Sequence, residues 1–237
     1  MKNFFLILWK WIKRLVLAFF ALSILSVIVY RWVPVPVTPL MLIRCVQQKF
    51  AGEPMKLDKK WVSFDNISPN LPFAVFCSED QDFFKHHGFN FKAIQDALKH
   101  DEHSKRIVGA STISQQTAKN VFLSVNRSWI RKGFEAYFTV LIEFFWSKKR
   151  IMEVYLNVIE FGKGIYGAEA ASEAYFHKHA KDLTKEEAST LAAILPDPLK
   201  WSAAHPGPFV QSRRDWILGQ MADYGGKLDF ANPPVVK

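Results

Sequence analysis

Cysteine and strand-like patterning are both scarce in this sequence. The 237 residues contain only two cysteines, Cys45 and Cys77, at a spacing that gives no disulfide framework. We expect both thiols to be unpaired, with Cys77 packed as a small apolar side chain. Alternating polar and apolar positions are rare and no internal repeat occurs, so the pattern favours one mainly α-helical domain. Aromatic residues make up 15% of the chain, which argues against disorder.

Acidic residues are absent from the first 31 positions, which carry five cations. These cations are Lys2, Lys10, Lys13, Arg14 and Arg31. The formal net charge is +9, so the rest of the chain carries about +4 (9 minus 5) and is only mildly basic. So small an excess argues against nucleic-acid binding. A polyanionic or pyrophosphate-bearing partner stays open.

Charge of either sign is missing from residues 15–30, LVLAFFALSILSVIVY. A transmembrane helix over residues 15–33 would be roughly 28 Å long, close to the thickness of a bilayer core. Trp and Tyr residues flank this run on both sides, as interfacial anchors do. The cations before the run predict a cytoplasmic N-terminus at residues 1–14 and an extracytoplasmic remainder. A cleaved signal peptide is the alternative, but YRWVPVP offers no small-x-small cleavage site.

The remaining chain divides into a membrane-proximal linker at residues 34–69 and a domain at residues 70–237. The proline-rich VPVPVTP, residues 33–39, leads from the transmembrane helix into the linker and is expected to be extended, and the linker includes one short helix at residues 41–50. In the domain, apolar periodicity predicts helices at residues 73–84, 91–99, 111–122, 129–146, 149–160, 166–176 and 184–195. Thr184 and Glu187 have the spacing of a capping box before the last of these helices.

A first cluster of reactive side chains lies in SEDQDFFKHHGFNF, residues 78–91. Glu79 follows the apolar run LPFAVFC, so its carboxylate is expected to be partly desolvated, as suits a general base or acid. The alternative is that Glu79 and the neighbouring acid are solvated on a helix surface. His86 and His87 lack the spacing of a metal site, so we expect them to form structural hydrogen bonds.

A second cluster lies in VGASTISQQTAKNVFL, residues 108–123. If the stretch is helical, Ser111, Gln115 and Lys119 stand at i, i+4 and i+8 and form one polar stripe. The free N–H groups at the start of such a helix favour an anion, and Lys119 adds a full charge. The alternative is an ordinary amphipathic helix with a solvated side.

A third cluster lies in RSWIRKGFEAYFTVLIEFFW, residues 127–146. Glu135 follows Arg127, Arg131 and Lys132 closely, and it shares a predicted helix face with Glu143. A carboxylate in that position can order cations around a leaving phosphate or hold a divalent metal against it. The alternative is an acid that stabilises the start of a helix. Paired carboxylates would also serve glycoside chemistry, so spacing alone leaves the reaction open.

The three clusters resemble the signature motifs of the peptidoglycan glycosyltransferases, glycosyltransferase family 51. The motifs are Glu79-Asp80-x-x-Phe83-x-x-His86-x-Gly88, then Gly109-x-Ser111-Thr112-x-x-Gln115-Gln116-x-x-Lys119-Asn120, then Arg131-Lys132-x-x-Glu135. SKKRIMEVYLNVIEFG is similar to the family's K-x-x-I-L-E-x-Y-L-N segment, with Met152 in place of Leu. The resemblance covers about residues 70–200, and Asn90 departs from the Asp that the family often has.

The resemblance implies a mainly α, lysozyme-like domain of two lobes. An apolar jaw at about residues 89–107, with Phe91, Ile94 and Leu98, would sit against the membrane. Because the chain ends at Lys237, it resembles the monofunctional members, which have no transpeptidase domain. The implied localisation is the bacterial inner membrane, with the catalytic domain in the periplasm. The implied partners are lipid II, a lipid-linked glycan chain, membrane lipids and other cell-wall synthesis and division proteins.

The resemblance also implies the mechanism. Glu79 would be the general base that deprotonates the acceptor's 4-hydroxyl, and undecaprenyl pyrophosphate would leave from the donor with inversion. Lys119, Arg127 and Arg131 would carry the pyrophosphate charge, while Glu135 would organise them, with Mg²⁺ or Mn²⁺ as one means of doing so. The side chains that would line the donor site are Ser111, Gln115, Gln116 and Asn120. The alternatives are a lysozyme-like lytic enzyme, which needs no phosphate cluster, and a non-catalytic membrane-tethered scaffold.

Overall fold

The protein is mainly helical, as the sequence pattern predicts. The computed structural model describes residues 2–93, 95, 111–124, 128–225 and 228–234. Its α-helices are α1 (Lys2–Tyr30), α2 (Pro39–Phe50), α3 (Asn70–Glu79), α5 (Ile113–Phe122), α6 (Trp129–Phe145), α7 (Lys148–Val158), α8 (Ala168–Phe176), α9 (Lys185–Ile194) and α10 (Pro208–Asp223). Short 3-10 helices, η1 (Phe64–Asn66) and η2 (Ala180–Asp182), accompany three short strands, β1 (Asp58–Lys59), β2 (Glu160–Gly162) and β3 (Ile165–Tyr166).

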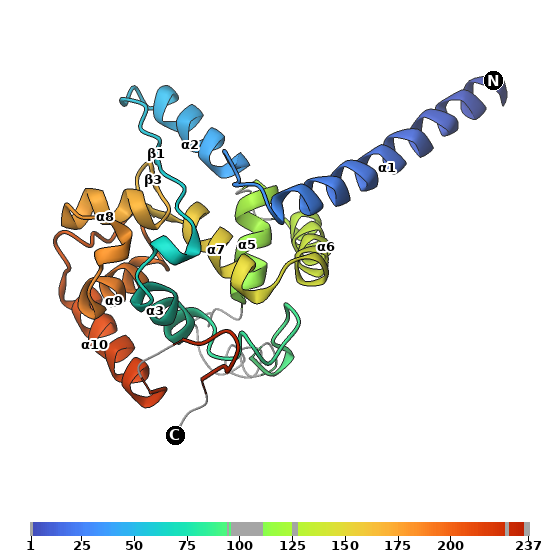
Figure 1. Cartoon of the computed structure of the whole chain (residues 1–237). Coiled ribbons are helices and arrows are strands. Elements are labelled where there is room, and N and C mark those ends of the chain that lie inside the picture. The colour runs from blue at the N-terminus through green and yellow to red at the C-terminus, as the bar shows by residue number, and fades with distance from the viewer. Residues whose placement is uncertain (1, 94, 96–110, 125–127, 226–227, 235–237) are drawn as a thin grey trace.

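The N-terminal helix α1 stands out from the domain (Figure 1). Residues Phe4–Tyr30 are long and apolar enough to cross a membrane. The helix ends at Tyr30 rather than at the predicted residue 33, because the chain turns at Arg31 and Trp32. The Arg150 guanidinium fixes this end: it donates to the carbonyl oxygens of Tyr30 at 2.9 Å and Val33 at 2.8 Å.

The C-terminal half of α1 packs on α6. Ser23 Oγ lies 2.8 Å from the hydroxyl of Tyr137, and Trp146 Nε1 donates to the carbonyl of Val27 at 2.7 Å. One turn earlier, the rings of Phe19 and Phe134 meet edge to face with centroids 5.5 Å apart. Aromatic contacts and hydrogen bonds therefore fix α1 on the domain along several turns.

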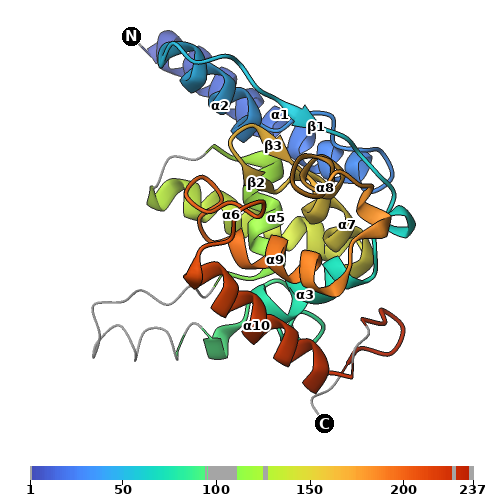
Figure 2. The same ribbon diagram turned by 90° about the vertical axis from the view of Figure 1, so that its left-hand side faces the viewer.

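The core of the domain lies around α7 and α9. Helix α7 is buried from Ile151 to Val158 except at Glu153, and α9 contacts both α3 and α10 (Figure 2). Thr184 and Glu187 form the predicted capping box at the start of α9. Cys45 and Cys77 are free, as expected. Burial raises the pKa of the Cys77 thiol to about 12, so this thiol behaves as a small apolar side chain.

Helix α3 differs from its predicted bounds of residues 73–84 at both ends. It starts at Asn70 because Pro72 fits within its first turn, where backbone N–H groups have no intrahelical acceptor. It ends at Glu79, since Asp80 leaves the helical conformation with φ −160° and ψ 79°. The Asp80 carboxylate instead accepts from the backbone N–H of Ile113 at 3.0 Å. This tertiary bond competes with continuation of the helix.

The small sheet and α10 are absent from the predictions. Strand β3 pairs in parallel with β1 and antiparallel with β2. Consequently Glu160 and Tyr166, predicted at the ends of two helices, lie in strands. Helix α10 begins with Pro208 after Gly207 and buries Val210, Ile217 and Met221. Of the predicted helix at residues 91–99, residues 91–93 and 95 are described and are helical; its other residues and most of the predicted jaw lie outside the described residues.

The segment predicted as a membrane-proximal linker, residues 34–69, packs against the domain. Leu40 and Met41 of α2 are buried, and β1 supplies an edge of the sheet through Asp58 and Lys59. The predicted short helix at residues 41–50 is confirmed, and it starts two residues earlier at Pro39, with Thr38 as its cap. The chain between α1 and α3 thus contributes to the fold.

Gly167 is a point where the backbone requires glycine. Its φ is +83°, and a Cβ atom there would lie 2.7 Å from the carbonyl oxygen of Asn157 in α7. We expect Gly167→Ala to lower the free energy of unfolding by about 1–3 kcal/mol, because left-handed strain and a backbone clash add. Gly219→Ala is the control, since nothing lies within 4 Å of its Cβ position. Urea unfolding of the two variants in detergent would compare them, and equal midpoints would contradict the expectation.

Candidate active site

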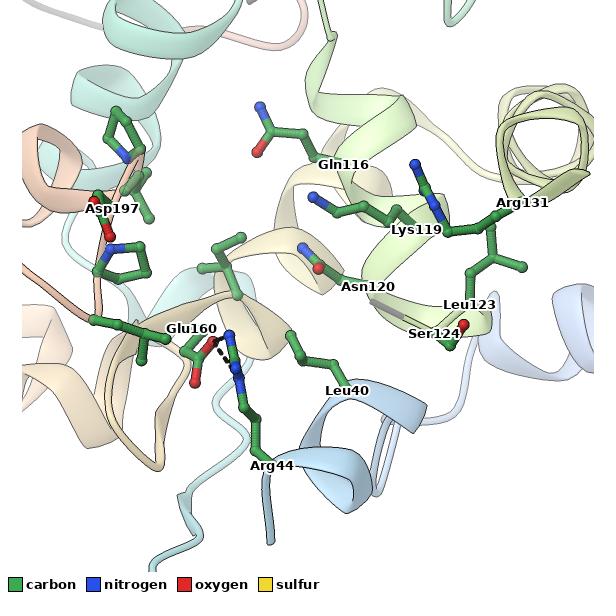
Figure 3. Close-up of a pocket in the computed structure, with 15 residues that line it drawn as sticks. Leu40, Arg44, Gln116, Lys119, Asn120, Leu123, Ser124, Arg131, Glu160 and Asp197 are labelled. Carbon is green, nitrogen blue, oxygen red and sulfur yellow. Dashed lines mark hydrogen bonds and ion pairs between the residues drawn. The ribbon is translucent and has the colours of Figure 1, made fainter. Parts of the chain in front are cut away.

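A pocket of about 380 Å³ opens between α2, α5 and α6 (Figure 3). Helix α5 supplies Gln116, Lys119 and Asn120, which stand three and four residues apart and so share one face. Arg131 of α6 lies beside them, and Arg44 of α2 lies across the pocket. The pocket is therefore rich in hydrogen-bond donors and carries three cations, against two acids, Glu160 and Asp197, that also line it.

The side chains of α5 that face the pocket differ from those of the predicted stripe. The helix begins at Ile113, so Ser111 lies outside it. Thr112 is the N-cap, and Gln115 closes a capping box: its Oε1 accepts from the Thr112 N–H at 3.1 Å. The side chain of Gln115 is therefore used to cap the helix. The residues of α5 that line the pocket are Gln116, Lys119 and Asn120. Ser111 instead lines a second cavity of about 160 Å³ that also contains Glu79.

Lys119 is held in the pocket with its charge largely removed from water. Burial lowers the pKa of its ammonium group, the carboxylates of Glu135 and Glu79 raise it, and the cations Arg131 and Lys132 lower it further. A bound anion would supply the missing counter-charge. The pocket thus contains a cation whose environment favours an anionic ligand.

Two further donors around this pocket lack partners within the described residues. Asn120 Nδ2 and Arg131 Nε are both buried without a hydrogen bond. Buried donors without partners are costly in a folded protein, and a ligand that accepts from them removes the cost. Asn120 therefore points, with Lys119, to a ligand rich in oxygen acceptors.

Glu135 lies beneath the cations and contacts two of them. Its carboxylate is almost fully buried; Oε2 accepts from Arg131 Nη1 at 2.6 Å, and Oε1 pairs with Lys132. A hard divalent cation needs several oxygen ligands, whereas both Glu135 oxygens here are engaged by cations. Among the described residues, Glu135 thus does not fit a resident Mg²⁺ or Mn²⁺ site, and its contacts are those of a residue that orders Arg131 and Lys132. The metal dependence implied by the family resemblance stays a prediction.

Glu79 is the last residue of α3, and several helices hold its carboxylate. The side chain is 14% exposed. Oε2 accepts from Gln116 Nε2 of α5 at 3.0 Å, and Oε1 accepts from Ser78 Oγ at 3.1 Å and from Arg213 Nη2 of α10 at 3.4 Å. Gln116 lines the pocket of about 380 Å³ and Glu79 lines the cavity of about 160 Å³, so the hydrogen bond between them links the two.

Tyr155 of α7 orients the Gln116 amide. Its hydroxyl donates to Gln116 Oε1 at 3.2 Å, which turns Nε2 toward Glu79. Burial raises the pKa of the phenol well above its usual value, and the carboxylates of Glu79 and Asp80 add to the rise. The phenol therefore stays a donor throughout the working pH range.

Tyr155→Phe tests whether the Tyr155 hydroxyl orients the Gln116 amide. The change removes one hydrogen bond worth about 1 kcal/mol, so we expect turnover to fall a few-fold through misorientation of Gln116. The measurement is a double-mutant cycle, in which the turnover rates of the wild type, Tyr155→Phe, Gln116→Ala and the double variant are compared. Since Tyr155 acts through Gln116, its loss should add nothing once Gln116 is absent. Fully multiplicative losses would mean that Tyr155 supports the fold rather than this amide.

His86 is structural, as expected for a histidine without ligand spacing. Its Nδ1 accepts from the Gly88 N–H at 3.1 Å, so Nε2 carries the proton and donates to Asp80 Oδ1 at 3.0 Å. Asp80 in turn binds the Ile113 N–H, which joins the loop after Glu79 to the start of α5. Glu143 bonds Ser114 and Lys148 rather than the cations of the pocket.

Two cations at the site have no motif that would reveal them in the sequence. Arg213 lies in a helix that the apolar pattern did not predict, 134 residues from Glu79. Arg44 lies in the segment predicted as a linker and pairs with Glu160 at 3.3 Å. Arg127, predicted beside Arg131, lies outside the described residues.

Comparison with known proteins agrees with this arrangement. A family model described as Transglycosylase matches residues 47–222. Three relatives carry the name "Biosynthetic peptidoglycan transglycosylase". The one from Pseudomonas putida is 52% identical over 91% of each chain, and the one from Bacteroides thetaiotaomicron is 54% identical over 90% of this chain and 86% of its own. The one from Pseudomonas aeruginosa is 50% identical over 92% of this chain and 94% of its own. The chain belongs to the transglycosylase family.

Proposed function

We propose that the protein is a peptidoglycan glycosyltransferase that polymerises glycan strands from lipid II. The observation that carries the proposal is a partly buried carboxylate, Glu79, linked through Gln116 to a pocket that holds Lys119 and Arg131. The first group suits a general base and the others suit a pyrophosphate. The family membership and the names of the relatives support the same activity.

In the proposed step, Glu79 takes the proton from the acceptor's 4-hydroxyl. The acceptor oxygen forms a bond to the anomeric carbon of the donor as the bond from that carbon to the pyrophosphate oxygen breaks. The sugar centre inverts, and undecaprenyl pyrophosphate leaves. Lys119 and Arg131 receive the charge that develops on the leaving group, and Asn120 donates its unpartnered N–H group to an oxygen of the donor.

The other site residues have more indirect roles in this proposal. Glu135 holds Arg131 in place, and Gln116 orients Glu79. Ser111 lines the smaller cavity and contacts the acceptor there. Gln115 acts by fixing the start of α5. Arg127 joins the phosphate-binding cations, as the family resemblance implies.

The membrane helix supports an envelope location for the reaction. Phe4–Tyr30 fits a membrane anchor, and a lipid-linked donor requires an enzyme at the membrane. We propose that this membrane is the inner membrane, with residues 1–14 in the cytoplasm and the catalytic domain in the periplasm. The cations at the start of α1 support that orientation. Other cell-wall synthesis and division proteins are the proposed partners.

The test is the product that the purified full chain makes from labelled lipid II and, separately, from pre-made glycan. Long glycan from lipid II is the expected result. Fragments of pre-made glycan would indicate a lytic enzyme, although the cations of the pocket argue for a phosphorylated donor. Binding of both without turnover, with divalent metal and detergent varied, would indicate a scaffold.

A further inference from the structure

Helix α2 has one apolar face that no part of the described chain covers. Leu42, Val46 and Phe50 stand at i, i+4 and i+8, so they form one stripe. Their exposed fractions are 54%, 53% and 88%. Met55 and Leu57, just after the helix, are also exposed. The opposite face, with Met41 and Gln48, is buried against the domain.

The position of this stripe is fixed relative to α1. Only eight residues, 31–38, separate the end of α1 from the start of α2. Arg150 holds the carbonyls of Tyr30 and Val33, and Lys59 Nζ donates to the carbonyl of Val35 at 2.6 Å. The connection is thus pinned to the domain at several points, and α2 cannot swing freely about the end of α1.

Helices α1 and α2 leave the domain on the same side. Figure 2 shows both helices pointing away from the domain on the same side, and Figure 1 shows that α1 and α2 diverge from a common base, α1 to the right and α2 to the left. Because α1 and α2 point to opposite sides from this base, α2 does not follow α1 across a membrane, and a position along the bilayer surface is open to it. A short amphipathic helix with apolar residues on one face and cations such as Lys49 beside them suits that surface.

We propose that α2 is an interfacial membrane helix that inserts Leu42, Val46 and Phe50 into the outer boundary of the bilayer that α1 crosses. The occupant of the stripe is lipid, because only eight residues separate α2 from the end of a helix that is long and apolar enough to cross a membrane, and the stripe is apolar and exposed. The position of α2 also bears on the function proposed above. Leu40 and Arg44 on the other face of α2 line the large pocket. The pocket then opens at the lipid surface, where a lipid-linked pyrophosphate can enter with its tail still in the bilayer.

The first test measures insertion without any turnover. A Cys45→Ser background leaves only Cys77, which is buried and will not label. Val46→Cys carries an environment-sensitive fluorophore, and the full chain is reconstituted into phosphatidylcholine vesicles. We expect a blue-shifted emission that a lipid-attached shallow quencher abolishes and aqueous iodide hardly affects. Lys185→Cys on α9 is the exposed control and should show the reverse. Equal iodide quenching at the two sites would overturn the proposal, whatever the activity of the protein.

The second test separates membrane docking from catalysis. Val46→Glu with Phe50→Glu places charges on the stripe without touching the buried face of α2. We expect several-fold slower polymerisation of lipid II in vesicles, and an unchanged rate in detergent with a short-chain, water-soluble lipid II analogue. Loss of both rates would indicate damage to the pocket, and no loss of either would mean that α2 does not need the bilayer. If the wild type makes no polymer at all, the proposed function fails while the quenching result stands.

Discussion

Replacing Glu79 by Gln is expected to reduce polymerisation by about 10²–10⁴-fold, the usual contribution of a general base. Gln has the same shape but cannot take a proton from the acceptor hydroxyl. The surroundings of Glu79 accommodate the amide, because its oxygen can still accept from Gln116 or Arg213. The fold should therefore persist, and the measurement is the rate of glycan formation from lipid II beside the unfolding midpoint of each protein.

Two variants accompany this change. Glu79→Asp keeps the carboxylate but withdraws it by one methylene, so its activity should lie between those of the wild type and Glu79→Gln. Glu173→Gln is the matched control, because this acid of α8 lies outside both cavities and pairs with Lys60 near the surface. Its rate should equal that of the wild type. Binding of lipid II to Glu79→Gln should also be unchanged, since only the proton acceptor is lost.

A Glu79→Gln protein that polymerises at the wild-type rate would place the base elsewhere. Asp80, the neighbouring acid, is a poor substitute because His86 and the Ile113 N–H occupy its carboxylate. Such a result would mean that the contacts of Gln116 and Arg213 serve to hold α3, α5 and α10 together rather than to position a base.

The sequence predicts the features of this protein that depend on local pattern. Helix α6 and the capping box of α9 follow from periodicity and cap spacing, and both lie where predicted, with α6 one residue shorter at its end. Lys119 reaches the pocket because it belongs to a contiguous motif on one helix. The family resemblance supplied the proposed roles of these residues, which composition and spacing alone left open.

Features that depend on long-range packing escape such a prediction. The predicted stripe on α5 is wrong at Gln115, because this side chain forms a capping box with Thr112. Gln116 lines the pocket instead. Arg213 meets Glu79 only because α10 packs on α3 and α9, and the apolar residues of α10 show no clear helical period. The strands of the sheet are two or three residues long, too short for alternation to reveal.

Replacing Lys119 by Ala is expected to lower polymerisation by about 10²–10³-fold, as the loss of a preorganised charge at a leaving group does. Unlike Glu79→Gln, this change should also weaken binding of the pyrophosphate-bearing donor. It should not weaken the fold. The lowered pKa of Lys119 means that the folded state disfavours its charged form, and that penalty is fully present below the folded-state pKa. The penalty fades as the pH rises toward the unfolded value of 10.5, and Ala removes it at every pH.

The same pKa shift predicts how activity depends on pH. The charge on Lys119 is lost at a lower pH than for an ordinary lysine, so the alkaline limb of the rate profile should fall below pH 10.5. Lys119→Arg keeps a charge that cannot titrate in this range, so the alkaline limb should move to higher pH even if the maximal rate falls. A limb that stays in place in Lys119→Arg would assign the titration to another group. A Lys119→Ala protein that binds the donor as tightly as the wild type would show that Arg131 and its neighbours hold the pyrophosphate without Lys119.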